Sequence, residues 1–320
     1  MSARAANNGA LRVGVVGVGH LGKHHARLLA AMPDVQLLGV ADLVEERARA
    51  ATAGTSAEVF ADAAALLDRV DAVSLAVPTV DHLSVARPFL ERGIAVLVEK
   101  PMAASVAEAE EMLALAERSG AVLGVGHTER FNPAMAAAWP LIGTPRFIEI
   151  HRLSGFPERS LDIDVIFDVM IHDLDIIQAI DKSEVVGVEA VGVHVLTSKT
   201  DICNARVKFA SGCIANITAS RISRDKVRKV RFFQQDMYVS IDYGAQELEV
   251  WRLRHRPGDR PVIEGGQVEV TRDEPLKREL EDFVQAAREK RATGVSGAEG
   301  LRALKLATRV AEAVEKLGPA

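Results

Sequence analysis

Three glycines in the run Gly17-Val18-Gly19-His20-Leu21-Gly22 constrain the fold of this chain more than any other feature. They follow the apolar run Leu11–Val16 and open a segment with helical periodicity, His20–Met32. In that context the first glycine permits a tight turn, the second lets the backbone approach a pyrophosphate, and the third allows the helix to pack closely on the strand. The free N–H groups at the helix N-terminus also favour a phosphate. The turn therefore predicts a dinucleotide-binding site.

Asp42 completes this pattern, because it lies twenty residues after Gly22, at the end of the second predicted strand. Its carboxylate can accept a hydrogen bond from a ribose 2′-hydroxyl and would repel a 2′-phosphate. The sequence therefore favours NAD, and the neighbouring Arg47 and Arg49 leave NADP as the alternative.

Apolar runs and helical patterns alternate over the first part of the chain, as they do in a parallel sheet covered by helices on both faces. We therefore expect residues 11–126 to form a doubly wound α/β Rossmann domain, after a disordered lead-in over residues 1–10. The expected strands are Leu11–Val16, Val35–Ala41, Ala72–Val77, Ile94–Val98 and Val122–Val125, and the expected helices are His20–Met32, Glu45–Ala53, Asp81–Arg92 and Ser105–Ser119.

The pattern changes after Asn132-Pro133, where β-rich runs separated by turn signals replace the alternation. Residues 127–320 are thus predicted to form a second α/β domain with a mostly antiparallel sheet. A loop-rich stretch, Gly143–Asp164, is expected to lead into a helix over Val165–Ile180. The further strands are expected at Val185–Thr197, Ile202–Ala210, Cys213–Ser220, Val227–Ile241, Gln246–Arg254 and Gln267–Thr271, and the closing helices at Pro275–Arg291 and Gly297–Leu317.

Charge and composition exclude several classes of protein. A net charge of −5 over 320 residues gives no general attraction to nucleic acid or to an acidic membrane. No apolar run approaches the ~20 residues that span a bilayer, and the N-terminus has no signal-peptide core. Cys203 and Cys213 lie in strand-like segments without facing each other, so we expect reduced, unreactive thiols in a cytoplasmic protein.

Glu99-Lys100-Pro101 ends the apolar run Ile94–Val98, where a buried strand would reach the ligand-binding edge of the sheet. A desolvated ammonium is costly without partners, so Lys100 is expected to have a chemical task. Ala76-Val77-Pro78, at the end of an earlier strand, would line the path of the cofactor. His82 opens the next predicted helix and is either a cap or a cofactor contact.

Asp168, His172 and Asp175 have the spacing i, i+4 and i+7, which places them on one face of a helix. Our preferred interpretation is an alcohol oxidation in which His172, oriented by Asp168, takes the hydroxyl proton. Lys100 would stabilise the negative charge that develops on the oxygen, or act as the base itself. A divalent-metal site and a buried polar helix face are the alternatives. Asp173 is expected to point away, toward solvent or a helix cap.

Together these residues resemble the glucose–fructose oxidoreductase / inositol dehydrogenase family, Gfo/Idh/MocA. The resemblance runs through the glycine turn, Asp42, Ala76-Val77-Pro78, Glu99-Lys100-Pro101, Asp168-x-x-x-His172 and the closing segment Ser296–Leu301. It implies a Rossmann domain followed by a substrate and oligomerisation domain, whose open sheet packs against a partner subunit in a homodimer or homotetramer. One departure is the segment Asp162–Phe167, where many members carry glycines.

The resemblance also implies roles for individual residues. Lys100, His172 and Asp168 would be catalytic, with no metal, and Lys100-Pro101 often forms a cis bond in this family. The implied contacts to NAD are Gly17, Val18, Gly19, His20, Leu21, Gly22, Asp42, Ala76, Val77, Pro78, His82, Glu99, Lys100 and Pro101.

Two segments are left to shape the substrate pocket, Gly126–Pro133 and His151–Arg159. Arg152 and Arg159 can neutralise a diphosphate and Phe156 can pack on a base, with solvated loop arginines as the alternative. The first segment and Asp168–Asp175 resemble a branch of the family that oxidises the 3-hydroxyl of UDP-N-acetylglucosamine, for 3-amino-sugar synthesis in lipid A. The implied substrate residues are Arg130, Asn132, Arg152, Phe156, Arg159 and Asp175.

Three other functions compete with this one. An inositol or free-sugar dehydrogenase would use the same residues on an unphosphorylated polyol. An NAD-dependent glycosidase would oxidise the sugar transiently. A non-catalytic NAD-binding regulator is disfavoured, because Lys100, Asp168 and His172 are all present.

Overall fold

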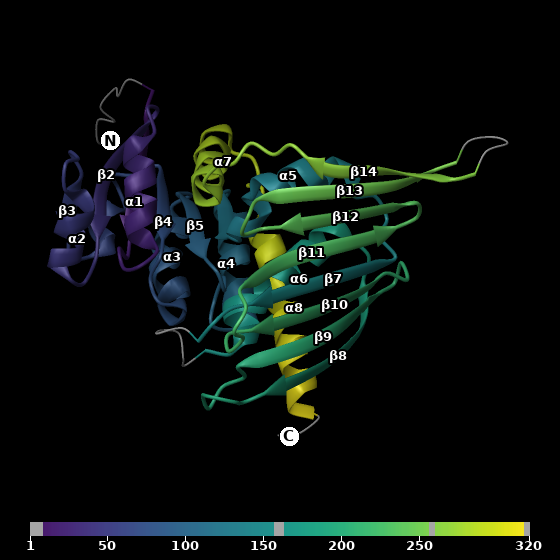
Figure 1. Cartoon of the computed structure of the whole chain (residues 1–320). Helices are drawn as coiled ribbons and strands as arrows, with labels where there is room; N and C mark the ends of the chain where they lie inside the picture. Colours follow the sequence, from purple (N-terminus) through teal and green to yellow (C-terminus); the bar gives the residue numbers. More distant parts are fainter. Residues whose placement is uncertain (1–8, 157–162, 256–259, 317–320) are drawn as a thin grey trace. The chain divides into compact units, whose positions relative to one another are not determined.

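The computed structural model describes residues 9–156, 163–255 and 260–316, which form two sheets with their covering helices (Figure 1). The chain divides into two compact units. The first comprises residues 1–126 and 276–301, and the second comprises residues 127–275 and 302–320. None of the helices in the described ranges has both the length and the apolar character needed to cross a bilayer.

The first unit contains a parallel six-stranded sheet with the order β3-β2-β1-β4-β5-β6. This order is the doubly wound Rossmann arrangement, and it confirms the predicted fold class. The order reverses between β1 and β4, which is where such sheets bind ligands. The strands are β1 (Leu11–Val16), β2 (Val35–Ala41), β3 (Glu58–Phe60), β4 (Ala72–Leu75), β5 (Ala95–Glu99) and β6 (Leu123–Gly126), and the helices between them are α1 (Gly22–Ala31), α2 (Glu45–Thr52), α3 (His82–Glu91) and α4 (Val106–Ser119).

The first unit also takes in a segment from near the C-terminus. Leu280, Phe283 and Val284 of α7 (Pro275–Glu289) are buried in the same apolar cluster as β1 and α1. The predicted domains, residues 11–126 and 127–320, are each continuous, so they leave this returning helix out of the first one. The reason is physical, because the apolar face of α7 needs a partner that lies far away in the sequence.

The closing motif begins α8 (Gly297–Lys316) with a reciprocal capping box. The Glu299 N–H donates to Ser296 Oγ at 3.4 Å, and the Ser296 N–H donates to the Glu299 carboxylate at 3.0 Å. A Cβ on Gly297 would lie 2.8 Å from Leu123, and one on Gly300 would overlap Val125. The two glycines therefore allow the start of α8 to lie close against β6.

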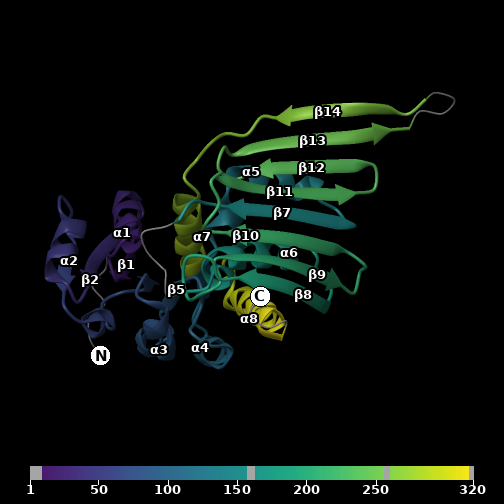
Figure 2. The same ribbon diagram turned by 60° about the horizontal axis from the view of Figure 1, so that its bottom comes forward.

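The second unit contains an eight-stranded sheet in which only β7 and β10 run parallel to each other among the described strand pairs. α5 (Pro133–Ala138) and α6 (Ile171–Ile180) lie on one face, as Figures 1 and 2 both show, and their apolar side chains join the sheet in one buried cluster. The sheet order is β14 (Val262–Val268), β13 (Glu247–Arg254), β12 (Met237–Asp242), β11 (Val227–Gln234), β7 (Phe147–Leu153), β10 (Ile214–Ser220), β9 (Ile202–Phe209) and β8 (Val185–Val193).

Three expectations for this unit were wrong. The strand expected at Gln267–Thr271 overlaps β14 only at Gln267 and Val268. Phe147–Leu153 lies in the predicted loop-rich stretch but forms β7, a central strand in which Ile148, Ile150 and Arg152 are buried. The predicted strand Val227–Ile241 is a hairpin, because Asp236 has a φ of +56° and turns the chain between β11 and β12.

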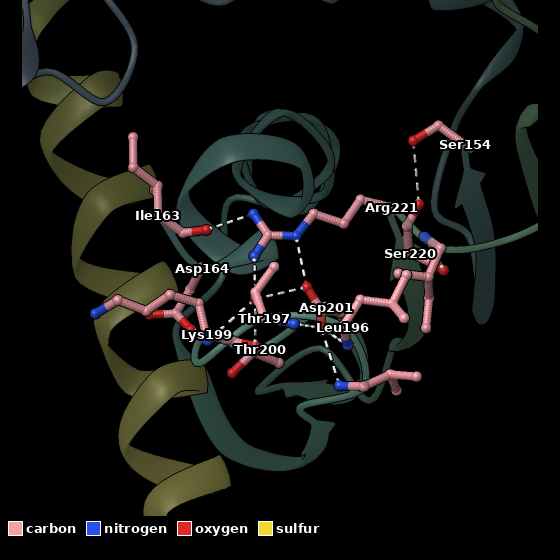
Figure 3. A network of polar contacts seen from close by, with 12 residues as sticks. Ser154, Ile163, Asp164, Leu196, Thr197, Lys199, Thr200, Asp201, Ser220 and Arg221 are labelled. Carbon is pink, nitrogen blue, oxygen red and sulfur yellow. Dashed lines mark hydrogen bonds and ion pairs between the residues drawn. The ribbon is translucent and has the colours of Figure 1, made fainter. Parts of the chain in front are cut away.

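A buried ion pair organises the loop that joins β8 to β9 (Figure 3). The Arg221 guanidinium donates to Asp201 at 2.9 Å, and both side chains are at most 1% exposed. Asp201 also accepts the N–H groups of residues 195, 196 and 197 at 2.7 to 2.9 Å. Burial raises the pKa of Asp201, but these backbone hydrogen bonds outweigh it and hold the value well below the usual range.

The same network fixes the start of the segment that carries Asp168 and His172. Arg221 donates to the carbonyl oxygen of Ile163 at 2.6 Å, and the Asp164 carboxylate accepts the N–H of Thr200 at 2.7 Å (Figure 3). The Asp168 N–H then donates to the Asp164 carbonyl at 3.1 Å. Ile163 and Asp164 lie in the segment that departs from the glycines of the resembled family. Their hydrogen bonds attach the start of this helical segment to Arg221 and Thr200.

We expect Arg221→Met to lower the free energy of unfolding by about 3–5 kcal/mol, because it leaves the Asp201 carboxylate buried without its cation. Urea unfolding followed by circular dichroism measures this. The double variant Arg221→Met/Asp201→Asn should recover part of the loss, and Arg224→Met, at an exposed arginine, should have little effect. An Arg221→Met variant as stable as the parent would contradict this account.

Candidate active site

The glycine turn has the geometry that a dinucleotide requires. Gly17 has a φ of +79°, and a Cβ there would lie 2.7 Å from the carbonyl oxygen of Ala76. A Cβ on Gly22 would overlap the carbonyl oxygen of Gly17, whereas one on Gly19 would meet no atom within 4 Å. Sterics within the protein thus explain the first and third glycines. The space around Gly19 fits the close approach of a ligand.

Asp42 lies beside this turn, at the end of β2. Its carboxylate accepts the N–H of Val18 at 2.8 Å and the N–H of Val44 at 2.8 Å. Ala76 follows β4, and its N–H donates to the carbonyl of Val16 at 2.9 Å. The structure therefore gathers the predicted residues of β1, β2 and β4 around the turn, with Val18 tied directly to Asp42.

Glu99 was expected to contact the cofactor, but its side chain is buried against His25. One carboxylate oxygen lies 3.0 Å from Nε2 of His25, and the other accepts the Lys100 N–H at 3.3 Å. Glu99 is 8% exposed and His25 is 1% exposed. Lys100 is half-buried, and the Lys100-Pro101 peptide bond is cis, as the family resemblance implies.

His82 connects the segments that follow β4 and β5. Its Nδ1 lies 3.0 Å from the carbonyl oxygen of Pro101, and its Nε2 lies 3.1 Å from that of Val77. The ring is 1% exposed. Both nitrogens face backbone carbonyls, so the side chain holds these two segments together. Asp81 rather than His82 is at the N-cap position of α3, and a contact of His82 with the cofactor stays a prediction.

In the second unit, Asp168 and His172 belong to a helix that changes its geometry between them. Ile166–Met170 is a π-helical turn, and α6 begins at Ile171. A π turn advances by a smaller angle per residue, so the i, i+4 spacing does not by itself set the directions of the two side chains. Such turns often occur at functional sites. Both side chains are half-buried.

His127 is a neighbour of His172 that the sequence reasoning did not single out. The two rings meet edge to face, with centroids 5.5 Å apart and planes at 90°. His127 is 1% exposed. Its position directly after β6 (Leu123–Gly126) was the available signal, because the carboxyl ends of parallel strands are where such folds bind ligands.

Arg130 and Asp175, both predicted to bind substrate, pair with each other. The guanidinium donates to the carboxylate at 2.7 and 3.1 Å, with side chains 9% and 2% exposed. Arg130 also lies over the ring of Trp139 at 5.6 Å. The side-chain oxygen of Asn132, a third predicted residue, accepts the N–H of Ala134 as the cap of α5.

Arg152 and Asp173 form a buried ion pair, contrary to both expectations. Asp173 was expected to face solvent, but it is fully buried and accepts two hydrogen bonds from Arg152 at 2.7 and 2.8 Å. Arg152 also donates to Glu129 at 2.8 Å, and its cation lies 5.4 Å from the ring centre of Tyr243. Burial raises the pKa of Asp173, although the charge of Arg152 opposes it. Arg152, which was predicted to neutralise a diphosphate, is thus a buried cation that already pairs with carboxylates of the protein.

Of the last two predicted substrate residues, only Phe156 lies in the described ranges, shortly after β7. Phe156 is 47% exposed, which leaves its ring accessible to a partner. Arg159 lies outside the described residues. Within the described ranges, no group of three or more His, Cys, Asp or Glu side chains is placed to hold a metal ion.

Both cysteines are free thiols, and burial raises the pKa of Cys203 to about 12 and that of Cys213 to about 11. They are therefore protonated and unreactive at neutral pH.

The parallel sheet and its glycine turn are those of a dinucleotide-binding protein, and the family model adds that the class is an oxidoreductase. Comparisons with known proteins agree. The model of the oxidoreductase family with an NAD-binding Rossmann fold, GFO_IDH_MocA, matches residues 11–127. UDP-N-acetylglucosamine 3-dehydrogenase of Acidithiobacillus ferrooxidans is 40% identical over 95% of this chain and 97% of its own. Inositol 2-dehydrogenase of Rhizobium meliloti is 28% identical over 95% and 97%.

Solved structures extend the comparison. A structure of the Acidithiobacillus ferrooxidans enzyme matches with a TM-score of 0.89 and 39% identity, over 96% of this chain and 98% of that one. Levoglucosan dehydrogenase in complex with NADH and levoglucosan matches with a TM-score of 0.86 at 20% identity, which shows the shared fold alone. The chain belongs to the Gfo/Idh/MocA family of oxidoreductases.

The buried ring of His82 predicts a pH dependence of stability. Burial lowers the pKa of His82 below its ordinary value of 6.5, against the hydrogen bonds to Val77, Met102 and Pro101. Below pH 6.5 the unfolded chain therefore binds a proton that the folded chain does not, so stability is complete above this pH and falls below it.

We expect the free energy of unfolding to fall between pH 7 and pH 5.5 by up to about 1.4 kcal/mol per pH unit through this group. Urea unfolding at a series of pH values measures the slope. The slope should be smaller in His82→Gln and unchanged in His255→Gln, a control at a histidine whose side chain is 61% exposed. Equal slopes in His82→Gln and the parent would contradict the prediction.

Proposed function

We propose that this protein oxidises the 3-hydroxyl of UDP-N-acetylglucosamine to a 3-keto nucleotide sugar. The observation that carries this proposal is the 40% identity to a UDP-N-acetylglucosamine 3-dehydrogenase over 95% of this chain and 97% of the relative. The inositol 2-dehydrogenase is only 28% identical over the same share. An aminotransferase that consumes the 3-keto product would place the reaction in 3-amino-sugar synthesis for lipid A.

The residues of the first unit support NAD as the cofactor. Gly17 and Gly22 form the turn, the space at Gly19 suits a pyrophosphate, and the carboxylate of Asp42 lies beside the turn. A carboxylate there favours the ribose 2′-hydroxyl of NAD over the 2′-phosphate of NADP. When bound, NAD would accept the hydride from the sugar carbon.

The protein's own side chains would handle the proton. We propose that His172 accepts it from the sugar hydroxyl and that Asp168, in the π turn before it, orients the imidazole. Lys100 would donate a hydrogen bond to the same oxygen and stabilise its negative charge. His127, edge-on to His172, would limit the directions that the His172 ring can take.

The buried pairs of the second unit suggest how the sugar nucleotide is recognised. Arg130–Asp175 and Arg152–Asp173 would shape the pocket from within, since their charges already meet each other. Direct contacts would then come from the loop after β7. We propose that Phe156 packs on the base and retain Arg159 as the candidate for the diphosphate.

A homodimer or homotetramer through the open face of the large sheet remains a proposal. Exposed apolar side chains on the outer strands support it, including Val186 on β8 and Ile263 on β14, which are 60% and 69% exposed. Light scattering determines the assembly.

We expect the purified protein to form NADH from NAD and UDP-N-acetylglucosamine, more slowly with NADP. Because the equilibrium of a secondary alcohol with NAD is unfavourable near neutral pH, the assay should include an aminotransferase that consumes the ketone. Absorbance at 340 nm follows the reaction. No product with this coupling would contradict the proposal. Activity on inositol, glycoside cleavage without net NADH, or NAD binding without turnover would indicate the three alternatives.

Replacing the proton-handling residues should lower kcat and leave NAD binding nearly unchanged. We expect about 10²- to 10⁴-fold losses for Lys100→Met and for His172→Gln, in line with general acid–base and oxyanion contributions. Because both serve one oxygen, the double variant should lose less than the product of the single losses. Steady-state kinetics and calorimetric titration with NAD measure the two quantities. Near-normal kcat in both single variants would contradict the proposed roles of Lys100 and His172.

A further inference from the structure

Three buried polar side chains of the first unit form a chain that ends at Lys100. Ser74 on β4 lies 2.7 Å, through its Oγ, from Nδ1 of His25 on α1. Nε2 of His25 lies 3.0 Å from the carboxylate of Glu99 at the end of β5. The carboxylate then accepts the N–H of Lys100. Ser74 is 0% exposed, His25 1% and Glu99 8%.

His25 lies between the other two side chains. Its Nδ1 is within hydrogen-bond distance of the Ser74 hydroxyl, and its Nε2 is within ion-pair distance of the Glu99 carboxylate without hydrogen-bond geometry. The ring therefore fills the space between the hydroxyl on β4 and the carboxylate at the end of β5.

Glu99 carries a negative charge despite its burial. Burial raises the pKa of Glu99, but the contact with His25, and then the charge and N–H of Lys100, bring it below the ordinary value. The charged or titratable groups that face it are His25 on α1 and Lys100 directly after β5, and the charge of Glu99 also acts on His82 on α3. On β6, a Cβ at Gly126 would lie 3.1 Å from the carboxyl group, so the site is closed from that side.

Burying the Glu99 carboxylate lowers the stability of the fold, which suggests that the group has a functional role. A buried carboxylate loses its hydration, and apolar side chains of similar volume would pack at these three positions without that loss. The charge lies next to the candidate catalytic lysine, and α1 begins at the dinucleotide turn. The three residues therefore join the cofactor helix to the lysine segment.

We propose that Ser74, His25 and Glu99 are positioning residues for Lys100. The Glu99 carboxylate fixes the Lys100 backbone by accepting its N–H. His25 and Ser74 hold that carboxylate in place. The inference rests on the proposed function only in giving Lys100 its role in the reaction.

The hold on the Lys100 segment can be tested without any substrate. Trace acetylation by an N-hydroxysuccinimide ester, followed by peptide mass spectrometry, measures the labelling rate of Lys100 relative to Lys23 in the same sample. Because Glu99→Gln weakens the hydrogen bond to the Lys100 N–H and frees the segment, it should raise the relative rate about 3- to 10-fold. Glu117→Gln, at an exposed glutamate, should leave the rate unchanged.

The positioning effect can be tested by kinetics. We expect His25→Ala to lower kcat about 10- to 100-fold, because a displaced reacting group loses rate steeply, while the Kd for NAD changes little. His25→Gln, whose amide can donate to Glu99, should recover much of the loss. Ser74→Ala removes a single hydroxyl and should give a smaller decrease in kcat in a fully folded protein, so the test stands even where His25→Ala is unstable.

The outcomes separate this inference from the proposed function. Unchanged Lys100 labelling in Glu99→Gln would overturn it whatever the substrate is. Equal kcat in His25→Ala, Ser74→Ala and the parent would also overturn it. Raised labelling in a protein that oxidises no nucleotide sugar would support the inference and contradict the proposed function alone.

Discussion

The close packing of the glycine turn on the end of β4 is the constraint on which the first unit depends. A side chain at Gly22 would overlap the carbonyl of Gly17, and one at Gly17 would lie 2.7 Å from the carbonyl of Ala76. Only without these Cβ atoms can α1 reach its place on the sheet. α1 in turn brings His25 to Ser74 and Glu99. One steric requirement therefore places both the cofactor turn and the support of Lys100.

The second unit depends on buried charges that are paired. Arg152 lies between Asp173 and Glu129, and Arg221 lies against Asp201. Removing such charges from water is costly, and the cost is offset only where each charge meets several partners in good geometry. Two pairs meet that condition and tie the segments around Asp168 and His172 to the sheet. Rigid attachment of this kind suits a helix whose side chains are proposed to hold a proton at a defined place.

Local patterns predicted much of the fold. Most strands of the first unit are largely apolar runs, which are typical of a parallel sheet buried on both faces, whereas the three-residue edge strand β3 was not expected. β7 alternates apolar and polar residues as a half-buried strand does, and it was missed because the glycines and prolines on either side of it made the whole stretch resemble a loop. Asp173 was misplaced because helical spacing tells which residues share a face and says nothing about what covers that face. Lys100 and His172 are proposed as catalytic from their residue types and motifs, and their roles stay a prediction.

The sequence by itself determined the dinucleotide turn, the fold class and the family, because these follow from local sterics and from residue types at fixed spacings. Only the tertiary structure decided which charged side chains are internal. Arg130 and Asp175 are 45 residues apart, yet they form one buried pair. Glu99 faces His25 because β5 and α1 meet in the folded sheet. Such pairings depend on which strands and helices become neighbours, and that information is absent from any local stretch of sequence.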